Sequence, residues 1–404
     1  MKQQRTLQAA TAAAAGAAAF AGALVGTIAL SLARQVVTLP SKPREPVRVV
    51  EIRPDRDAGA TGGTVVLERT IESHALGEFT MLWAQGRGRA RLLERLETTE
   101  RTVTRRYRDV RGTEFSGVRA VRLASAPQLG VEDLGLPWSE VAIPGEGGEL
   151  PGWFIPAAAE SSDWCIHIHG RGATLTEPLR TVPLVAERGW HSLVMQYRND
   201  PGAPTGQNGK TALGLTEWRD VDAALEWAKS RGARRVVLVG WSMGGAIAVQ
   251  AALRSVHADM IVGLMLESPA LDWYETLIWQ AGRLNVPPSI AKLGIRLLGS
   301  PLARPLLGTE GPLDLTELDV VARAPQLRWP TLVLASTGDT VVPVSGSQRL
   351  AKARPDLVTY EEFTSARHTR LWNTDPDRWE AVVGKWFDRL ATQASDSLVH
   401  GRVV

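Results

Sequence analysis

From Trp138 onward, short apolar segments alternate with longer amphipathic ones. Continuous apolar runs separated by amphipathic crossovers are typical of buried parallel strands joined by helices. The strands expected from these runs are Trp164–Ile168, His191–Tyr197, Val236–Val239, Gly263–Leu266, Thr331–Ala335 and Val358–Phe363. The expected helices are Glu177–Glu187, Glu217–Lys229, Met243–Arg254, Ser345–Ala353 and Asp377–Leu390. This order predicts an α/β fold whose sheet is covered by helices on both faces.

Two further features complete the expected domain. Glu140–Ile143 and Trp153–Ile155 read as antiparallel strands joined by a glycine-rich turn, which brings the sheet to eight strands. Residues 271–325 interrupt the alternation with short apolar runs broken by prolines, as expected for a small helical cap. We therefore predict a mostly parallel eight-stranded sheet over residues 138–395, with the cap inserted at 271–325.

The start of the chain has a different pattern. Residues 6–33 form an uncharged run between Arg5 and Arg34. As a helix this run would be about 42 Å long, enough to cross a membrane. We therefore predict a transmembrane signal-anchor over residues 1–35, with the α/β domain outside the cytoplasm. A signal peptide cleaved after Ser31-Leu32-Ala33, giving a secreted protein, is the second interpretation, and a soluble alanine-rich helix is the third.

Residues 36–137 separate this run from the α/β domain. Prolines and glycines up to Gly63 indicate a tether, and Thr64–Thr70 and Glu78–Ala84 are strand-like. Arg89–Tyr107 alternates arginine, threonine and leucine and fits either a strand or a helix. We interpret the segment as a tether followed by a small, β-rich accessory region.

Charge and cysteine content exclude several classes of protein. Net charge is +3, and eleven arginines lie between Arg87 and Arg122. Five acidic residues are interleaved with them, so we expect a salt-bridged surface and no nucleic-acid partner. The single cysteine, Cys165, lies in an apolar strand. One thiol permits no intrachain disulfide and no cysteine metal cluster, and we expect neither metal nor cofactor.

The strongest candidate for chemistry is the serine turn around Ser242. The sequence Gly240-Trp241-Ser242-Met243-Gly244-Gly245 lies between an apolar strand and a helix. A nucleophile on such a strained turn crowds the residues two before and two after it, so both must be glycine. The start of the helix beneath the serine favours a developing negative charge. The pattern therefore predicts Ser242 as a nucleophile.

A second glycine-bearing loop follows the strand that ends at Ile168. His169-Gly170-Arg171-Gly172 is placed where backbone N–H groups of a β/α turn meet an oxyanion. We assign the oxyanion hole to the amides of Met243 and Arg171, with Gly172 as the next candidate. We interpret His169 as a residue that packs the loop, and His167 as a core histidine.

The acid and the base are expected after the last two strands. Asp339 follows the strand Thr331–Ala335 through Gly338, and His368 follows Val358–Phe363 by a short loop. In this arrangement His368 is the general base and Asp339 orients its imidazole. Asp272, after the preceding strand, is the alternative acid.

These motifs make residues 138–392 similar to the α/β-hydrolase family, in particular to its esterase, lipase and prolyl-oligopeptidase-like branches. The resemblance rests on the loop at His169, Tyr197-Arg198-Asn199-Asp200, the Ser242 turn, Gly338-Asp339 and His368. It implies a serine hydrolase that uses neither metal nor cofactor.

We expect a small-molecule carboxylic ester as the substrate, cleaved through an acyl-enzyme. Alternatives that use the same three residues are a peptidase or amidase and an acyltransferase. A catalytically silent, membrane-tethered binding protein that acts through the basic segment at Arg105 and Arg106 is the rival from another class. The sequence specifies no oligomeric state.

Overall fold

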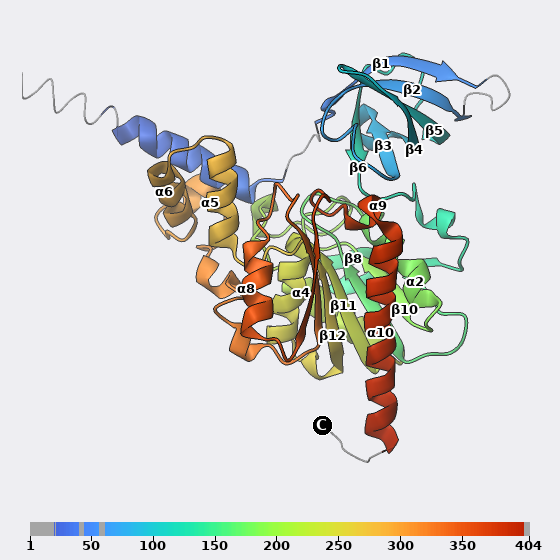
Figure 1. The fold of residues 1–404 in the computed structure, drawn as a ribbon. Coiled ribbons are helices and arrows are strands. Elements are labelled where there is room, and N and C mark those ends of the chain that lie inside the picture. Colours follow the sequence, from blue (N-terminus) through green and yellow to red (C-terminus); the bar gives the residue numbers. More distant parts are fainter. Residues whose placement is uncertain (1–19, 21, 40–43, 56–60, 400–404) are drawn as a thin grey trace, which may run out of the picture.

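The computed structural model describes residues 20, 22–39, 44–55 and 61–399. It contains a β-barrel, an α/β domain and a group of helices beside that domain (Figure 1). The barrel lies over the end of the α/β domain that carries α9 (Leu371–Thr374). The α/β domain contains the sheet expected to carry the site.

The accessory region forms a closed six-stranded barrel in the order β1-β2-β5-β4-β3-β6. Its strands are β1 (Val47–Pro54), β2 (Gly63–Glu68), β3 (Phe79–Trp83), β4 (Gly88–Thr98), β5 (Thr102–Gly112) and β6 (Ala120–Ala124). Pairing of Val47 with Val121 joins the first strand to the last. Residues that alternate along the strands, including Val65 and Leu67, fill the interior. The stretch that fitted either a strand or a helix forms β4 and β5.

The basic segment contributes to this barrel in two ways. Arg106 is exposed and pairs with Glu94 at 3.1 Å, as expected for a salt-bridged surface. The Arg105 side chain is fully buried and donates hydrogen bonds to the carbonyls of Leu93 and Ala75. Burial lowers the pKa of Arg105 to about 10. The prediction of a solvated surface was therefore wrong for Arg105, which is part of the barrel interior.

The α/β domain contains an eight-stranded sheet in the order β14-β13-β12-β11-β9-β10-β8-β7. Its strands are β7 (Ser139–Gly145), β8 (Gly148–Ile155), β9 (Asp163–Ile168), β10 (His191–Met195), β11 (Arg235–Trp241), β12 (Ile261–Glu267), β13 (Thr331–Ser336) and β14 (Val358–Phe363). The six strands from β14 to β10 are parallel, and β8 and β7 are antiparallel. The carboxyl ends of β9, β11, β13 and β14 therefore meet at one edge of the sheet.

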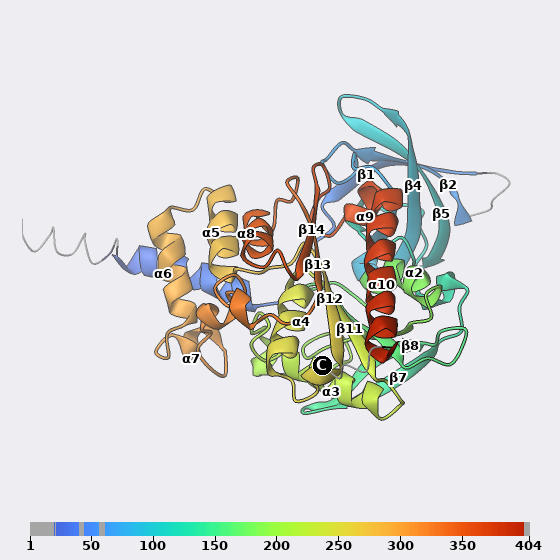
Figure 2. The same cartoon turned by 60° about the horizontal axis from the view of Figure 1, so that its bottom comes forward.

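Helices cover both faces of this sheet (Figure 2). Alternate residues of β11 point in opposite directions: Val236 and Leu238 join one core cluster, while Val237 and Val239 join the other. The first cluster packs against α3 (Trp218–Lys229), α4 (Met243–Arg254) and α8 (Ser345–Ala353). The second packs against α2 (Val182–Ala186) and α10 (Pro376–Val399). Burial on both faces explains why the strands are apolar throughout.

The inserted segment after β12 contains three helices, α5 (Trp273–Arg283), α6 (Pro288–Leu298) and α7 (Arg304–Leu307). A helix over residues 22–37, here called the N-terminal helix, packs against them. Its residues Ala29, Ala33 and Val37 are buried. The Ala29 carbonyl comes so close to Gly294 that a Cβ on that glycine would lie 3.1 Å from it.

This packing changes the interpretation of the N-terminal run. Residues 6–19 of the predicted membrane span lie outside the described residues. No helix among the described residues has the length and apolar character that a membrane span needs. The predicted transmembrane helix is therefore not supported, because its described part buries one face against the protein.

Candidate active site

Ser242 lies on a tight turn between β11 and α4. Its backbone has φ 53° and ψ −116°, a strained conformation for a residue with a side chain. A Cβ on Gly240 would lie 2.5 Å from the Gly244 carbonyl oxygen, and one on Gly244 would lie 2.1 Å from the Ile168 carbonyl oxygen. The turn therefore requires glycine at both positions, for the steric reason expected from the sequence.

Three predicted residues form one hydrogen-bonded chain. Ser242 Oγ lies 2.8 Å from His368 Nε2, and His368 Nδ1 lies 2.7 Å from Asp339 Oδ2. The Asp339 side chain is almost fully buried, whereas that of His368 retains 18% exposure. The carboxylate is thus shielded, and the imidazole and hydroxyl face the outside of the sheet edge.

The loop after β13 holds Asp339 in a fixed orientation. Its second oxygen, Oδ1, accepts hydrogen bonds from the backbone N–H groups of Val341 at 2.7 Å and Val342 at 3.0 Å. With Oδ1 occupied, Oδ2 is directed to the imidazole. The loop thereby determines which carboxylate oxygen faces His368.

The structure gives the alternative acid, Asp272, another role. Its side chain accepts a hydrogen bond from the Glu275 N–H at 2.9 Å and caps α5. It also pairs with Arg349 at 3.0 Å. Asp272 therefore belongs to the base of the cap and not to the hydrogen-bonded chain of Ser242.

The loop after β9 lies directly against the serine turn. A Cβ on Gly170 would lie 3.3 Å from Ser242 Cβ. The backbone amides of Arg171 and Met243 donate to no other group among the described residues. They are the two donors expected for an oxyanion, and Gly172, with φ 69°, completes the turn.

His169 fixes this loop from inside the protein. The ring is buried, stacks on Tyr197 with centroids 4.6 Å apart and contacts Asp200 at 2.9 Å. Burial opposes protonation of His169, but the Asp200 carboxylate outweighs it and raises the pKa. His169 thus packs the loop, as the sequence indicated. His167 is also buried, 3.0 Å from Ser192 Oγ, and burial lowers its pKa to about 3.

The Arg171 side chain connects the oxyanion loop to the N-terminal helix. Its guanidinium donates to the carbonyls of Gln35 at 3.0 Å and Thr38 at 2.7 Å. The residue itself is exposed, so these two hydrogen bonds lie at the protein surface. No local signal identifies its acceptors, because they lie more than 130 residues earlier in the chain.

Two cavities adjoin the oxyanion loop on different sides. An apolar cavity of about 260 Å³ lies between the N-terminal helix and the cap, and Arg171 also lines it. The apolar residues along it are Leu32, Ala33, Val36, Leu277, Ala281, Leu284, Ala291, Ile295 and Leu298. A polar cavity of about 210 Å³ lies toward the barrel and is lined by His368, Arg171 and Gly172 together with Arg122 of β6. The two cavities that flank this loop therefore differ in chemical character.

The comparisons with known proteins agree with this fold. The Alpha/beta hydrolase family profile matches residues 150–385, and the chain belongs to that family. This confirms the family resemblance inferred from the motifs.

Curated relatives include two bacterial enzymes named pimeloyl-[acyl-carrier protein] methyl ester esterase. The protein from Chromobacterium violaceum is 27% identical over 205 residues, which cover 43% of this chain and 78% of the relative. The protein from Vibrio atlanticus is 23% identical over 183 residues, which cover 37% of this chain and 70% of that relative. The Pyrococcus furiosus esterase Pf2001 has a similar structure, with a TM-score of 0.50 and 20% identity over 64% of this chain and 94% of its own. Esterase relatives support an enzyme of the α/β-hydrolase class.

Proposed function

We propose that this protein is a serine hydrolase that cleaves small carboxylic esters through an acyl-enzyme. The observation that carries the proposal is the continuous hydrogen-bonded chain from Ser242 through His368 to Asp339 on a strained turn. The names of the two curated relatives support an ester as the bond that is cleaved.

The mechanism follows from the direction of these hydrogen bonds. Asp339 accepts the Nδ1 proton of His368, which leaves Nε2 unprotonated and able to take the Ser242 proton. Ser242 Oγ then attacks the carbonyl carbon, and the negative charge on the oxygen is stabilised by the amides of Arg171 and Met243. His368 returns the proton to the leaving oxygen, and the alcohol departs.

Water completes the cycle at the same centre. His368 takes a proton from the water as it attacks the acyl carbon, and the proton then returns to Ser242 Oγ as the acid is released. The apolar cavity beside the N-terminal helix offers room for the acyl group, since Leu277, Ile295 and Leu298 provide aliphatic walls.

The test is labelling with a fluorophosphonate and hydrolysis of 4-nitrophenyl butyrate. Ser242→Ala should abolish labelling and lower turnover by about 10³-fold or more, because the variant has no nucleophile. Ser230→Ala is the matched control, since Ser230 Oγ bonds only groups at the end of its own helix, donating to the Trp227 carbonyl and accepting from Arg231. Unchanged labelling of Ser242→Ala, with intact folding by circular dichroism, would show that another residue is the nucleophile.

A further inference from the structure

The polar cavity beside His368 is built from two parts of the chain. The barrel supplies Leu82, Arg122 and Leu123, while the α/β domain supplies the oxyanion loop, His368 and Arg370. The barrel therefore forms a wall of the candidate active site. The chemical character of that wall determines what part of a substrate fits there.

Three arginines and one carboxylate line this cavity: Arg122, Arg171, Arg370 and Glu177. Arg122 and Arg370 form no ion pair with a carboxylate in the described part of the chain. Both side chains are partly buried, and this burial lowers the pKa of each guanidinium. A guanidinium in that situation binds an anionic oxygen strongly, because the anion replaces the lost hydration.

Arg370 is held in place but retains bonding capacity. Its Nη2 donates to the Leu123 carbonyl at 3.0 Å, and its guanidinium lies 5.1 Å from the centre of the Phe79 ring. Its Nη1 is buried without a hydrogen-bond partner, an unusual state for a charged donor. Glu177 also lines the cavity and offsets part of the arginine charge, but its carboxylate forms no ion pair with Arg122 or Arg370 among the described residues. It accepts hydrogen bonds from the Gly170 N–H at 2.8 Å and from Ser125 Oγ at 3.3 Å.

The position of His368 indicates which half of an ester enters this cavity. The imidazole must pass its proton to the leaving oxygen, so the alcohol half lies on the side of His368. His368 lines the arginine cavity, whereas the cavity between the N-terminal helix and the cap is apolar and lacks it. The acyl half then points toward the cap and the alcohol half toward the barrel.

We propose that Arg122 and Arg370 form a subsite for an anionic group, a carboxylate or a phosphate, carried on the alcohol half of the substrate. This inference rests on the proposed esterase function and specifies its substrate class. The substrate is then an ester of an apolar acid with an acidic alcohol or phenol.

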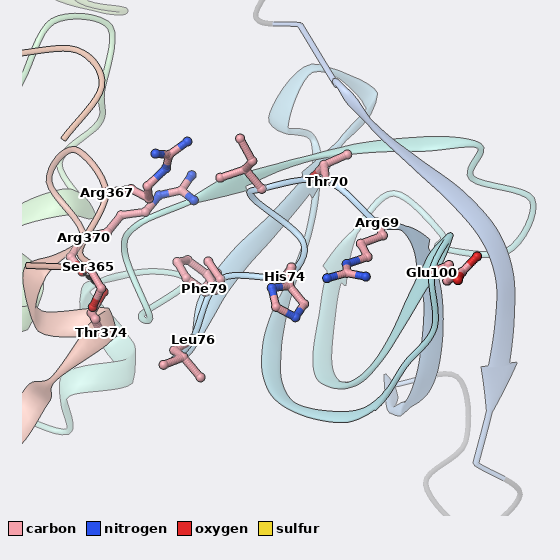
Figure 3. A pocket seen from close by; sticks show the side chains of 12 residues that line it. Arg69, Thr70, His74, Leu76, Phe79, Glu100, Ser365, Arg367, Arg370 and Thr374 are labelled. Atoms are coloured by element: carbon pink, nitrogen blue, oxygen red, sulfur yellow. Dashed lines mark hydrogen bonds between the residues drawn. The ribbon is translucent and has the colours of Figure 1, made fainter. Parts of the chain in front are cut away.

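A larger cavity of about 600 Å³ lies on the other side of Arg370 (Figure 3). Arg367 and Arg370 lie at one end of it, and Arg69, His74 and Glu100 lie at the other. Arg69 is exposed and does not line the cavity beside His368. It therefore supplies a matched control, an arginine of the same region outside the proposed subsite.

The experiment compares two esters with the same acyl group, 4-(butyryloxy)benzoate and its methyl ester. The ratio of their kcat/KM values, anionic over neutral, isolates recognition of the carboxylate. Arg122→Gln and Arg370→Gln should each lower this ratio about tenfold, the loss expected for one charge-assisted hydrogen bond. Arg69→Gln should leave it unchanged. 4-(Butyryloxy)phenyl phosphate, compared with the same methyl ester, shows which anion is preferred.

The outcomes separate this inference from the proposed function. Hydrolysis of the methyl ester that depends on Ser242, with a ratio unaffected by Arg122→Gln and Arg370→Gln, would refute the subsite and leave the esterase function intact. An equal loss in Arg69→Gln would also refute it. No hydrolysis of either ester by the wild-type chain would contradict the function itself. Arg122→Gln carries the test if Arg370→Gln lowers the melting temperature, because Arg122 is only partly buried, whereas Arg370 also donates a hydrogen bond to the Leu123 carbonyl.

Discussion

Asp339→Asn tests the proposed mechanism most directly, because the surrounding backbone dictates how the new side chain must lie. Oδ1 accepts hydrogen bonds from the N–H groups of Val341 and Val342, so the asparagine carbonyl must take that place. The amide NH₂ then faces His368 Nδ1, 2.7 Å away in the wild-type chain, and donates to it. The imidazole proton is forced to Nε2, where it blocks acceptance of the Ser242 proton.

The expected loss follows from this tautomer. Turnover of 4-nitrophenyl butyrate should fall by roughly 10³ to 10⁴-fold, about 4 to 5 kcal/mol of transition-state stabilisation. The fold should persist, because both backbone hydrogen bonds to Oδ1 are retained. The assay is steady-state kinetics with a parallel thermal melt.

Asp272→Asn is the matched control for this prediction, since it makes the same chemical change in the alternative acid. It should leave turnover near the wild-type value, because Asp272 caps α5 and pairs with Arg349. A loss of less than tenfold in Asp339→Asn, or a larger loss in Asp272→Asn, would refute the assignment of the acid.

Two other predictions concern the apolar cavity and a buried histidine. Ala281→Phe should fill part of the apolar cavity and lower kcat/KM for esters of long acyl chains relative to acetate. Each methylene group excluded from the cavity costs about 0.8 kcal/mol, so the loss is about tenfold for every two methylenes. Trp279 lies outside that cavity, so Trp279→Ala should not change this preference. Equal slowing of all esters by Ala281→Phe would contradict the assignment of the apolar cavity to the acyl group. Burial lowers the pKa of His167 to about 3 in the folded protein. As the pH falls below 6.5, this histidine is therefore protonated in the unfolded state but not in the folded state, and the free energy of unfolding decreases. Between pH 7 and pH 5, the free energy of unfolding should decrease by about 2 kcal/mol less in His167→Phe than in the wild-type chain, as measured by urea denaturation. An equal decrease in both would show that His167 does not cause it.

The serine turn could be predicted from the sequence because its constraints are local. Gly240 and Gly244 are required by contacts within a few residues of Ser242 or with the adjacent strand. Asp339 and His368 follow strands that are themselves clear apolar runs. Parallel strands then bring their carboxyl ends to one edge, so that residues far apart in the chain meet there.

The barrel and the subsite depend on long-range pairing that no local pattern encodes. Closure requires β1 to pair with β6, and β6 carries Arg122 to the cavity that His368 also lines. The environment of the uncharged run before Arg34 could not be predicted from local sequence either. An alanine-rich apolar helix fits a lipid phase or a protein surface equally well, and only the packing of Ala29 against Gly294 distinguishes the two.

The order of elements along the chain also has a consequence for modularity. The N-terminal helix packs on the cap, the chain then forms the barrel over Val47–Ala124, and it returns to the α/β domain at Ser139. The barrel is thus an insertion between two segments of one hydrolase body, not an appended domain. A shortened chain that joins those segments directly would retain Ser242, His368 and the cap while losing Arg122. Under the proposed role of Arg122, replacement of the barrel would therefore alter the preferred alcohol half of the substrate.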